Sequence, residues 1–241
     1  MAKAILIDTT SCTGCNTCTY RCIQEYGLHE YGARGIFRRY VLISDAGVYH
    51  HVCHHCKDPS CVAACPTGAL YKTSEGPVLY DSSKCIGCKS CVLACPFHVP
   101  VWDEETKTVV KCTMCAGRIA EGRPPACVEA CPTGALLFDD YDKVVAEAQR
   151  RAAARKLYIY GLEENGGTSV IVLTKEEPTK VGYLPVPKVP IRLGVPSTVA
   201  VGVAAAALAL GTLKRLRERA EEVKREEEKE KPGKPQQNEL T

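Results

Sequence analysis

Short runs of alternating apolar and polar residues predict strands in the first part of the chain. Residues 35–43 form one such run, and the adjacent Arg38 and Arg39 in it either face a partner subunit or belong to a plain hairpin strand. Residues 100–102 and 108–110 flank an acidic turn, and we expect them to pair as a hairpin.

From residue 140 the apolar spacing becomes helical. The apolar positions are Val144, Val145, Ala148 and Ala152. We therefore expect a helix over residues 140–156, with Asp140 as its N-terminal cap. Residues 157–160 and 169–173 then alternate around Asn165-Gly166-Gly167 and predict a second hairpin. This helix-hairpin segment, with the extended run after it, is expected to cover the rest of the fold as residues 139–192.

Residues 193–213 form the longest uncharged run of the chain, 21 residues in length. A helix of that length spans the hydrocarbon core of a bilayer, and the basic residues that start at Lys214 are typical of a cytoplasmic end. We expect a single transmembrane helix, a charged cytoplasmic tail over residues 214–241, and a body on the outer, periplasmic face of the cell membrane. The alternatives are a buried soluble helix and a body on the cytoplasmic face.

Export of that body needs a route, because Met1 to Asp8 contains no secretory apolar region. The simplest route is transport of the folded body together with a partner that carries a twin-arginine signal.

Composition shows that ordinary side-chain packing is not what holds the first half together. The chain has three Phe and one Trp, but all sixteen cysteines fall between Cys12 and Cys131. A cross-linking or metal framework must replace a large apolar core. The formal net charge is only +3, so bulk charge gives no argument for a nucleic acid partner, and we expect none.

The cysteines divide into four sets of four with none left over. Set one is Cys12, Cys15, Cys18 and Cys22; set two is Cys53, Cys56, Cys61 and Cys65; set three is Cys85, Cys88, Cys91 and Cys95; set four is Cys112, Cys115, Cys127 and Cys131. Disulfides need a secreted context, and zinc prefers two Cys-x-x-Cys pairs. Sets one and three instead have the bacterial ferredoxin spacing, in which the fourth cysteine binds the neighbouring cluster. The sequence therefore predicts four 4Fe-4S clusters in two ferredoxin-like units and an α+β fold over residues 1–138.

An internal repeat supports two equivalent units. Residues 8–18 recur as residues 81–91, and residues 61–70 recur as residues 127–136. The order is A, B, A, B, so sequential pairing of the sets (one with two, three with four) and nested pairing (one with four, two with three) are both compatible with the repeat.

The chain resembles the four-cluster iron-sulfur subunits of molybdopterin oxidoreductase complexes. The resemblance lies in the order and spacing of the four sets and in two segments, Lys111-Cys112-Thr113-Met114-Cys115 and Gly122 to Cys127. The resemblance covers residues 1–190 and implies nested pairing. The implied ligand sets are Cys12, Cys15, Cys18 and Cys131; Cys112, Cys115, Cys127 and Cys22; Cys53, Cys56, Cys61 and Cys95; and Cys85, Cys88, Cys91 and Cys65.

The resemblance also implies the function of an electron-transfer subunit rather than an enzyme. Its partners would be a molybdopterin catalytic subunit and an integral membrane cytochrome or quinone-site subunit. The helix-hairpin segment is similar to that of formate dehydrogenase beta subunits, which we favour over a polysulfide, thiosulfate or dimethyl sulfoxide reductase or a hydrogenase. The chain has no dinucleotide-binding glycine fingerprint and no phosphate loop that would suggest a substrate site. A free polyferredoxin shuttle is the remaining alternative.

Residues between the sets suggest further roles. His54 or His55 is a candidate N–H donor to a cluster sulfur, although packing or surface roles are the default. Lys57, Lys84 and Lys111 are candidates to offset cluster charge or to contact a partner, with solvated surface positions as the default.

Overall fold

The computed structural model describes residues 2–190 of the chain. The membrane segment and charged tail predicted for residues 193–241 lie outside this range. Within the described range, no helix is long and apolar enough to cross a bilayer.

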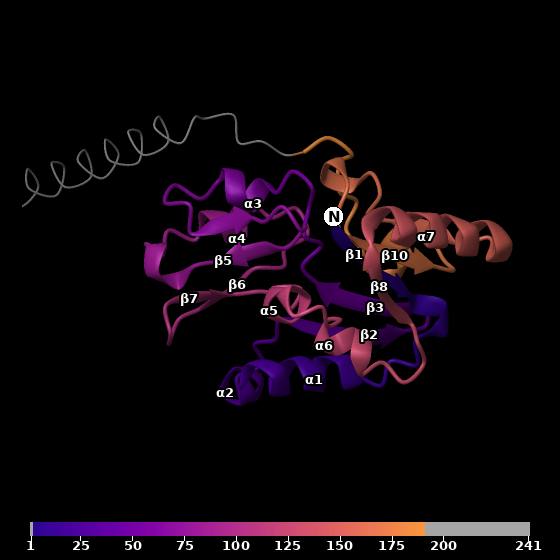
Figure 1. Cartoon of the computed structure of the whole chain (residues 1–241), viewed down its shortest axis with the longest axis horizontal. Coiled ribbons are helices and arrows are strands. Elements are labelled where there is room, and N and C mark those ends of the chain that lie inside the picture. The colour runs from indigo at the N-terminus through magenta and orange to yellow at the C-terminus, as the bar shows by residue number, and fades with distance from the viewer. Residues whose placement is uncertain (1, 191–241) are drawn as a thin grey trace, which may run out of the picture. The chain divides into compact units, whose positions relative to one another are not determined.

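A four-stranded sheet forms one side of the described body, with the strand order β8-β1-β10-β9 (Figure 1). The strands are β1 (Lys3–Asp8), β8 (Leu136–Asp140), β9 (Tyr158–Tyr160) and β10 (Val170–Thr174). The antiparallel pairing of β9 with β10 confirms the second predicted hairpin. The sequence did not predict that β10 also pairs in parallel with β1, which in turn pairs antiparallel with β8.

The two faces of this sheet bury different kinds of side chain. Because side chains alternate along a strand, Ala4 and Leu6 of β1 face helix α7 (Tyr141–Arg155), where they pack against Val144 and Ala148. The opposite face belongs to the larger core, which contains Ile5, Ile7, Val170 and Val172 together with several cysteines. The sheet therefore separates an ordinary apolar core from a cysteine-rich one.

Helix α7 agrees with the sequence prediction to within one residue at each end. The predicted capping role of Asp140 is wrong, because its side chain makes no cap hydrogen bond. The carboxylate instead accepts a hydrogen bond from Lys3 Nζ at 2.6 Å. That ion pair ties the start of the helix to β1.

Three two-stranded hairpins complete the strands. They are β2 (Arg39–Ser44) with β3 (Gly47–Val52), β4 (Leu70–Lys72) with β5 (Val78–Tyr80), and β6 (Val101–Asp103) with β7 (Thr108–Val110). The hairpin β6–β7 confirms the pairing predicted for residues 100–102 and 108–110. The strand predicted over residues 35–43 begins later, at Arg39. Arg39 points inward and is only 2% exposed, so the alternative in which it faces a partner is wrong.

The remaining helices are short. They are α1 (Thr17–Tyr26), α2 (His29–Ala33), α3 (Ser60–Ala63), α4 (Ser90–Ala94), α5 (Ala116–Ala120), α6 (Ala126–Glu129), α8 (Pro178–Val181) and the 3-10 turns η1 (Thr9–Ser11), η2 (Ser82–Lys84) and η3 (Glu164–Gly166). Helix α1 packs on α6, and α3 packs on α4. Set one therefore lies beside set four, and set two beside set three.

Arg118 joins α1 to α6 through a buried guanidinium. It donates to Glu25 Oε2 of α1 at 3.1 Å and to Glu129 Oε2 of α6 at 2.6 Å. The two carboxylates raise the pKa of Arg118 against the opposing effect of burial, which is the larger single contribution. This bridge holds the helices of sets one and four together.

Candidate iron-sulfur cluster sites

All sixteen cysteines lie in the described part of the chain, and none forms a disulfide. The structure gathers them into four groups. Group A is Cys12, Cys15, Cys18 and Cys131; group B is Cys22, Cys112, Cys115 and Cys127; group C is Cys53, Cys56, Cys61 and Cys95; group D is Cys65, Cys85, Cys88 and Cys91.

Groups A, B and D each line a cavity, and the thiols of group C are electrostatic neighbours of Cys61. Among residues 2–190, no three Cys, His, Asp or Glu side chains are gathered as the ligands of a single metal ion. Each group combines three cysteines of one set with one cysteine of another, in the nested arrangement that the resemblance implied. Cluster ligation by these groups stays a prediction.

Backbone N–H groups point at the first sulfur of three sets. Gly14 N–H donates to Cys12 Sγ at 3.4 Å, and Gly87 N–H donates to Cys85 Sγ at the same distance. In the third set, the N–H of Met114 donates to Cys112 Sγ at 3.2 Å. Both glycines have a φ of +71°, which L side chains rarely adopt, and a Cβ at Gly14 would also lie 2.3 Å from Cδ1 of Ile43. This backbone conformation therefore favours glycine at both positions, and the contact with Ile43 adds a steric reason at Gly14.

Buried thiols in these groups resist ionisation. Burial, followed by the neighbouring Cys127 thiol, raises the pKa of Cys22 to about 12. Burial and neighbouring thiols likewise raise the pKa of Cys56 to about 12 and that of Cys91 to about 11. Adjacent buried thiolates need a compensating cation, and the iron of a cluster supplies one, so cluster assembly would release protons.

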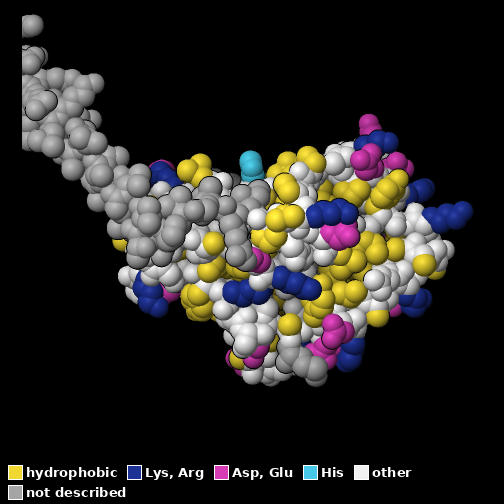
Figure 2. Space-filling model, turned by 90° about the horizontal axis from the view of Figure 1, so that it is seen from above, with side chains coloured by type: hydrophobic (Ala, Val, Ile, Leu, Met, Phe, Trp, Pro, Cys, Tyr) yellow, Lys and Arg dark blue, Asp and Glu magenta, His cyan; other side chains and the backbone are white. Residues whose placement is uncertain are grey.

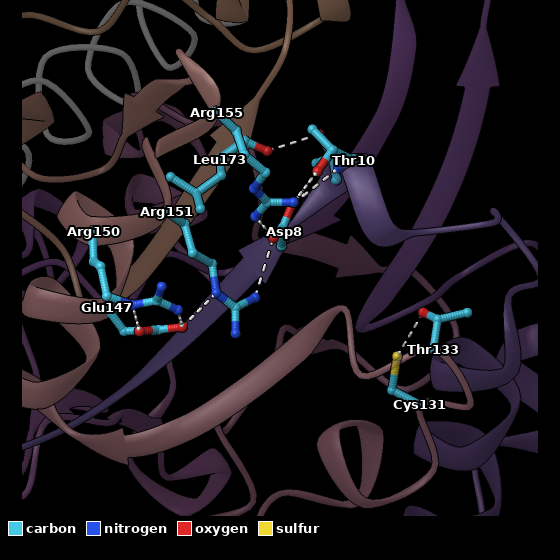
Figure 3. Close-up of polar contacts among 10 residues, drawn as sticks. Asp8, Thr10, Cys131, Thr133, Glu147, Arg150, Arg151, Arg155 and Leu173 are labelled. Atoms are coloured by element: carbon cyan, nitrogen blue, oxygen red, sulfur yellow. Dashed lines mark hydrogen bonds and ion pairs between the residues drawn. The ribbon is translucent and has the colours of Figure 1, made fainter. Parts of the chain in front are cut away.

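Two less buried thiols, the exposed Cys15 and the half-buried Cys131, behave differently. Hydrogen bonding by the Thr17 side chain lowers the pKa of Cys15. Burial opposes ionisation of Cys131, but contacts with Thr133 and nearby backbone groups outweigh it and lower the pKa of this thiol. Figure 3 shows Cys131 directed toward Thr133, with 3.7 Å between Sγ and Oγ1. Each of these two cysteines belongs to group A.

Two arginines line the cavity of group B. The Nε and Nη1 atoms of Arg38 and the Nε atom of Arg39 are buried and have no hydrogen-bond partner among the described residues. Unpartnered cationic N–H groups beside four thiols match the demands of an anionic cluster, because buried N–H groups are otherwise nearly always paired. The donor set and these two arginines therefore fit a 4Fe-4S cluster.

Asp8 fixes the loop that leads into group A. Its carboxylate accepts hydrogen bonds from the backbone N–H of Thr10 at 3.2 Å and from the Thr10 hydroxyl at 2.6 Å, and so caps η1. Arg151 and Arg155 of α7 both pair with the same carboxylate, Arg151 at 3.1 Å (Figure 3). Burial opposes ionisation, but Thr10 and the two arginines together lower the pKa of Asp8.

The histidines singled out in the sequence are buried and pack against other groups. The His54 ring stacks on Phe97 with centroids 4.2 Å apart, and His55 Nδ1 accepts a hydrogen bond from the backbone N–H of Val78 at 2.9 Å. The packing interpretation fits both residues, and the surface interpretation is wrong.

Lys111 also departs from its expected surface position. It is 3% exposed and donates to the backbone carbonyls of Val78 and Cys112. Lys57 and Lys84 are exposed, as the default interpretation predicted. The difference arises because Lys111 lies between β7 and a group B ligand candidate, where the chain passes through the core.

The sequence reasoning missed His50 on β3. Its Nε2 lies 3.3 Å from Cys12 Sγ, and its Nδ1 lies 3.0 Å from Nη2 of Arg39. Strand alternation supplies the signal that was overlooked, because His50 and Val52 of β3 point to the buried side together with Arg39 and Val41 of β2.

Comparisons with known proteins agree with this geometry. Residues 46–141 match the 4Fe-4S dicluster domain family. The protein is 37% identical over 156 residues to a subunit of the anaerobic dimethyl sulfoxide reductase of Escherichia coli (strain K12), covering 57% of its own length and 73% of that relative. It is 31% identical over 214 residues to the nitrate-inducible formate dehydrogenase iron-sulfur subunit of the same organism, covering 78% of its own length and 73% of the relative.

A third relative is the thiosulfate reductase electron transfer subunit of Salmonella typhi, 38% identical over 177 residues, with coverage of 69% of this chain and 89% of the relative. The chain belongs to the family of iron-sulfur electron-transfer subunits of molybdopterin oxidoreductase complexes. It is thus an electron-transfer subunit and not a catalytic one, with 4Fe-4S clusters as its cofactors, as the sequence predicted.

Proposed function

We propose that groups A, B, C and D each ligate one 4Fe-4S cluster, in two nested ferredoxin-like units. In this proposal the four clusters carry electrons, in that order, between a molybdopterin catalytic subunit and a membrane partner. The observation that carries the proposal is the distribution of exposure among the groups.

Every cysteine of groups B and C is buried, whereas groups A and D each contain one exposed cysteine, Cys15 and Cys88 respectively. A relay needs two accessible ends and a protected middle, since electrons must enter at one end, leave at the other and not escape between them. The two exposed groups are the natural ends.

Contacts between the groups support the linear order. Arg39 is an electrostatic neighbour of Cys18 in group A and of three group B cysteines. Cys112 of group B is in turn a neighbour of Cys53 in group C. Groups C and D are joined by the packing of α3 on α4. Each group therefore has a neighbour on the path from A to D.

Both proposed ends present apolar side chains to solvent. Tyr20, Leu42 and Ile43 are more than half exposed near group A, where a groove of about 730 Å³ lies beside α1. Ile86 and Leu93 are more than half exposed near group D. Figure 2 shows one face of the molecule, on which apolar side chains lie among charges of both signs. Exposed apolar groups at both ends favour a protein partner at each.

Among complexes of this family, we propose the formate dehydrogenase type. The alignment with the formate dehydrogenase iron-sulfur subunit spans 78% of this chain, against 57% and 69% for the two other relatives described above. The second candidate is a sulfur-compound reductase, favoured by the higher identity of 38% to the thiosulfate reductase subunit. Purification of the intact complex, followed by assays with formate, thiosulfate, polysulfide, dimethyl sulfoxide and hydrogen, distinguishes these candidates.

We also propose that residues 193–213 anchor the subunit in the cell membrane with the cluster body on the outer face. This rests on the uncharged run and the basic residues after it. Protease added to intact spheroplasts should digest the cluster body and spare the tail, whereas digestion of the tail alone would contradict the orientation. A free polyferredoxin shuttle should wash off membranes with salt, and an anchored subunit should not.

The cluster count has a direct test. Four clusters of four irons predict about sixteen iron and sixteen sulfide ions per chain. A content near eight, or zinc in place of iron, would contradict the proposal. Cys22→Ser should change the EPR signal of the group B cluster, which we expect to be magnetically coupled to the group A cluster. Its matched variant in the repeat, Cys95→Ser, should change group C instead. Loss of the group C cluster in Cys22→Ser, with the group B cluster intact, would contradict nested ligation.

A further inference from the structure

His50 is a buried histidine of β3 whose ring reaches a proposed cluster ligand. It is 1% exposed and lies opposite Val41 in the β2–β3 hairpin. Its Nε2 lies 3.3 Å from Cys12 Sγ, the sulfur that also accepts the backbone N–H of Gly14. The ring therefore adds a side-chain contact to a sulfur that already receives a backbone donor.

The neighbouring arginine determines which ring nitrogen carries the proton. Arg39 Nη2 lies 3.0 Å from His50 Nδ1. A guanidinium has only N–H donors and no acceptor, so Nδ1 must be the acceptor of that hydrogen bond. The proton of a neutral imidazole then sits on Nε2, which faces Cys12. The arrangement makes Nε2–H a donor to the sulfur rather than an acceptor from it.

The surroundings hold this geometry in place. The backbone N–H of His50 donates to the Tyr183 hydroxyl at 3.1 Å, which fixes the strand at this position. Arg39 is itself buried, between thiols of groups A and B. A ring fixed by two buried neighbours is pre-organised for one hydrogen bond, because little side-chain freedom remains to be lost.

We propose that His50 is a redox-tuning residue that raises the reduction potential of the group A cluster by donating Nε2–H to Cys12 Sγ, with Arg39 as its positioning residue. Reduction adds one electron to the cluster and breaks no bond. The added negative charge strengthens the N–H···S hydrogen bond, so the reduced form is favoured. This inference rests on the proposed ligation of a cluster by group A.

The test is a potentiometric titration of the cluster-loaded full chain, followed by EPR. His50→Leu removes the donor, and the group A cluster should become harder to reduce. We expect about a tenfold fall in its reduced-to-oxidised ratio at fixed potential, which corresponds to about 59 mV for one electron. His50→Gln keeps an N–H donor and should restore most of the ratio. The other three clusters should not change.

The adjacent histidine provides a matched control. His51 stacks on Tyr40 with centroids 4.5 Å apart, and its Nδ1 lies 3.2 Å from the Tyr49 hydroxyl. Its ring thus contacts aromatic neighbours of the hairpin. His51→Leu makes the same chemical change one residue away and should leave all four potentials unchanged.

Several outcomes would support or overturn the tuning role of His50. An unchanged group A potential in His50→Leu, with full iron content, overturns the tuning role. Equal shifts from His51→Leu also overturn it, since they would reveal a general effect of the hairpin. If His50→Leu loses iron, 15N-labelled histidine in the unaltered chain decides instead. A nitrogen hyperfine coupling to the reduced group A cluster supports the contact, and its absence overturns it. By contrast, a group A signal that survives Cys12→Ser and Cys131→Ser unchanged would show failure of the proposed ligand set itself.

Discussion

The two repeated cysteine loops begin with the same turn but lie in different surroundings. Asp8 accepts the Thr10 hydroxyl at 2.6 Å, and Asp81 accepts the Ser83 hydroxyl at the same distance. Asp8 is fully buried and pairs with two arginines of α7, whereas Asp81 is partly exposed and pairs with Lys84 of its own turn, at 3.1 Å. The repeated sequence thus sets the local turn, and elements outside the repeat decide its burial and charge.

Removal of iron should change the stability of the two loops more than any of the substitutions described below. The cysteine-rich cores lose their cross-links, so amide exchange protection should fall by several kcal/mol in the loops. The loop of residues 85–95 should lose protection first, because Asp8 still anchors the loop of residues 12–18 to α7. The core between β1 and α7 contains no cysteine and should stay protected longest. Equal exchange rates in the two loops after chelation would contradict the anchoring role.

Asp8→Asn tests the anchor directly. Asparagine still accepts from Thr10, so the variant removes the charge and keeps the cap. The half-buried Arg151 and the more exposed Arg155 then lack the Asp8 carboxylate, and because water partly solvates both guanidinium groups the loss should be about 2 kcal/mol. The melting temperature of the cluster-loaded chain should fall by several degrees. Asp81→Asn is the matched control, and it should change the melting temperature little because water solvates that carboxylate.

The stabilisation by the Asp8 carboxylate should also depend on pH. Because the folded-state pKa of Asp8 is lowered, its contribution is fully present well above the unfolded value of about 3.9 and is lost as pH falls from there through the lower folded-state pKa. The difference in melting temperature between the unaltered chain and Asp8→Asn should therefore be constant from about pH 7 to pH 5. It should become progressively smaller below about pH 4. A gap that widens with acid would contradict the assigned sign.

Lys84→Ala should have the smallest effect. The ion pair between Lys84 and Asp81 lies in solvent, with the lysine side chain 59% exposed, and screening leaves such pairs with little net stabilisation. The melting temperature and the group D potential should both stay close to those of the unaltered chain. A marked change in the melting temperature or in the group D potential would show that the exposed turn at Asp81 depends on its ion pair as the buried turn at Asp8 does.

Local elements of this fold were predictable from the sequence, and long-range pairings were not. The hairpin β6–β7, the hairpin β9–β10 and helix α7 follow from periodicity and turn residues close together in the chain. The pairing of β1 with β10 joins residues more than 160 positions apart, and alternation carries no information about such a partner.

The cysteine spacing predicted the candidate ligands but left their pairing open, because each repeat half is compatible with either neighbour. The resemblance supplied the nested choice, and the packing of α1 on α6 and α3 on α4 has the same arrangement. His50 and the burial of Arg39 were missed because both depend on which side of a hairpin faces the core.

The nested arrangement also has a consequence for the order of maturation during synthesis. The thiols of groups C and D all lie between Cys53 and Cys95, so a growing chain contains both complete ligand sets early. Groups A and B begin earlier, at Cys12 and Cys22, yet wait for Cys131 and Cys127. With the proposed ligation, the first of these four cysteine loops to be synthesised is therefore among the last to be completed. Iron-sulfur loading should proceed from the inner pair outward, and a nascent chain arrested soon after Cys95 leaves the ribosome should accept two clusters.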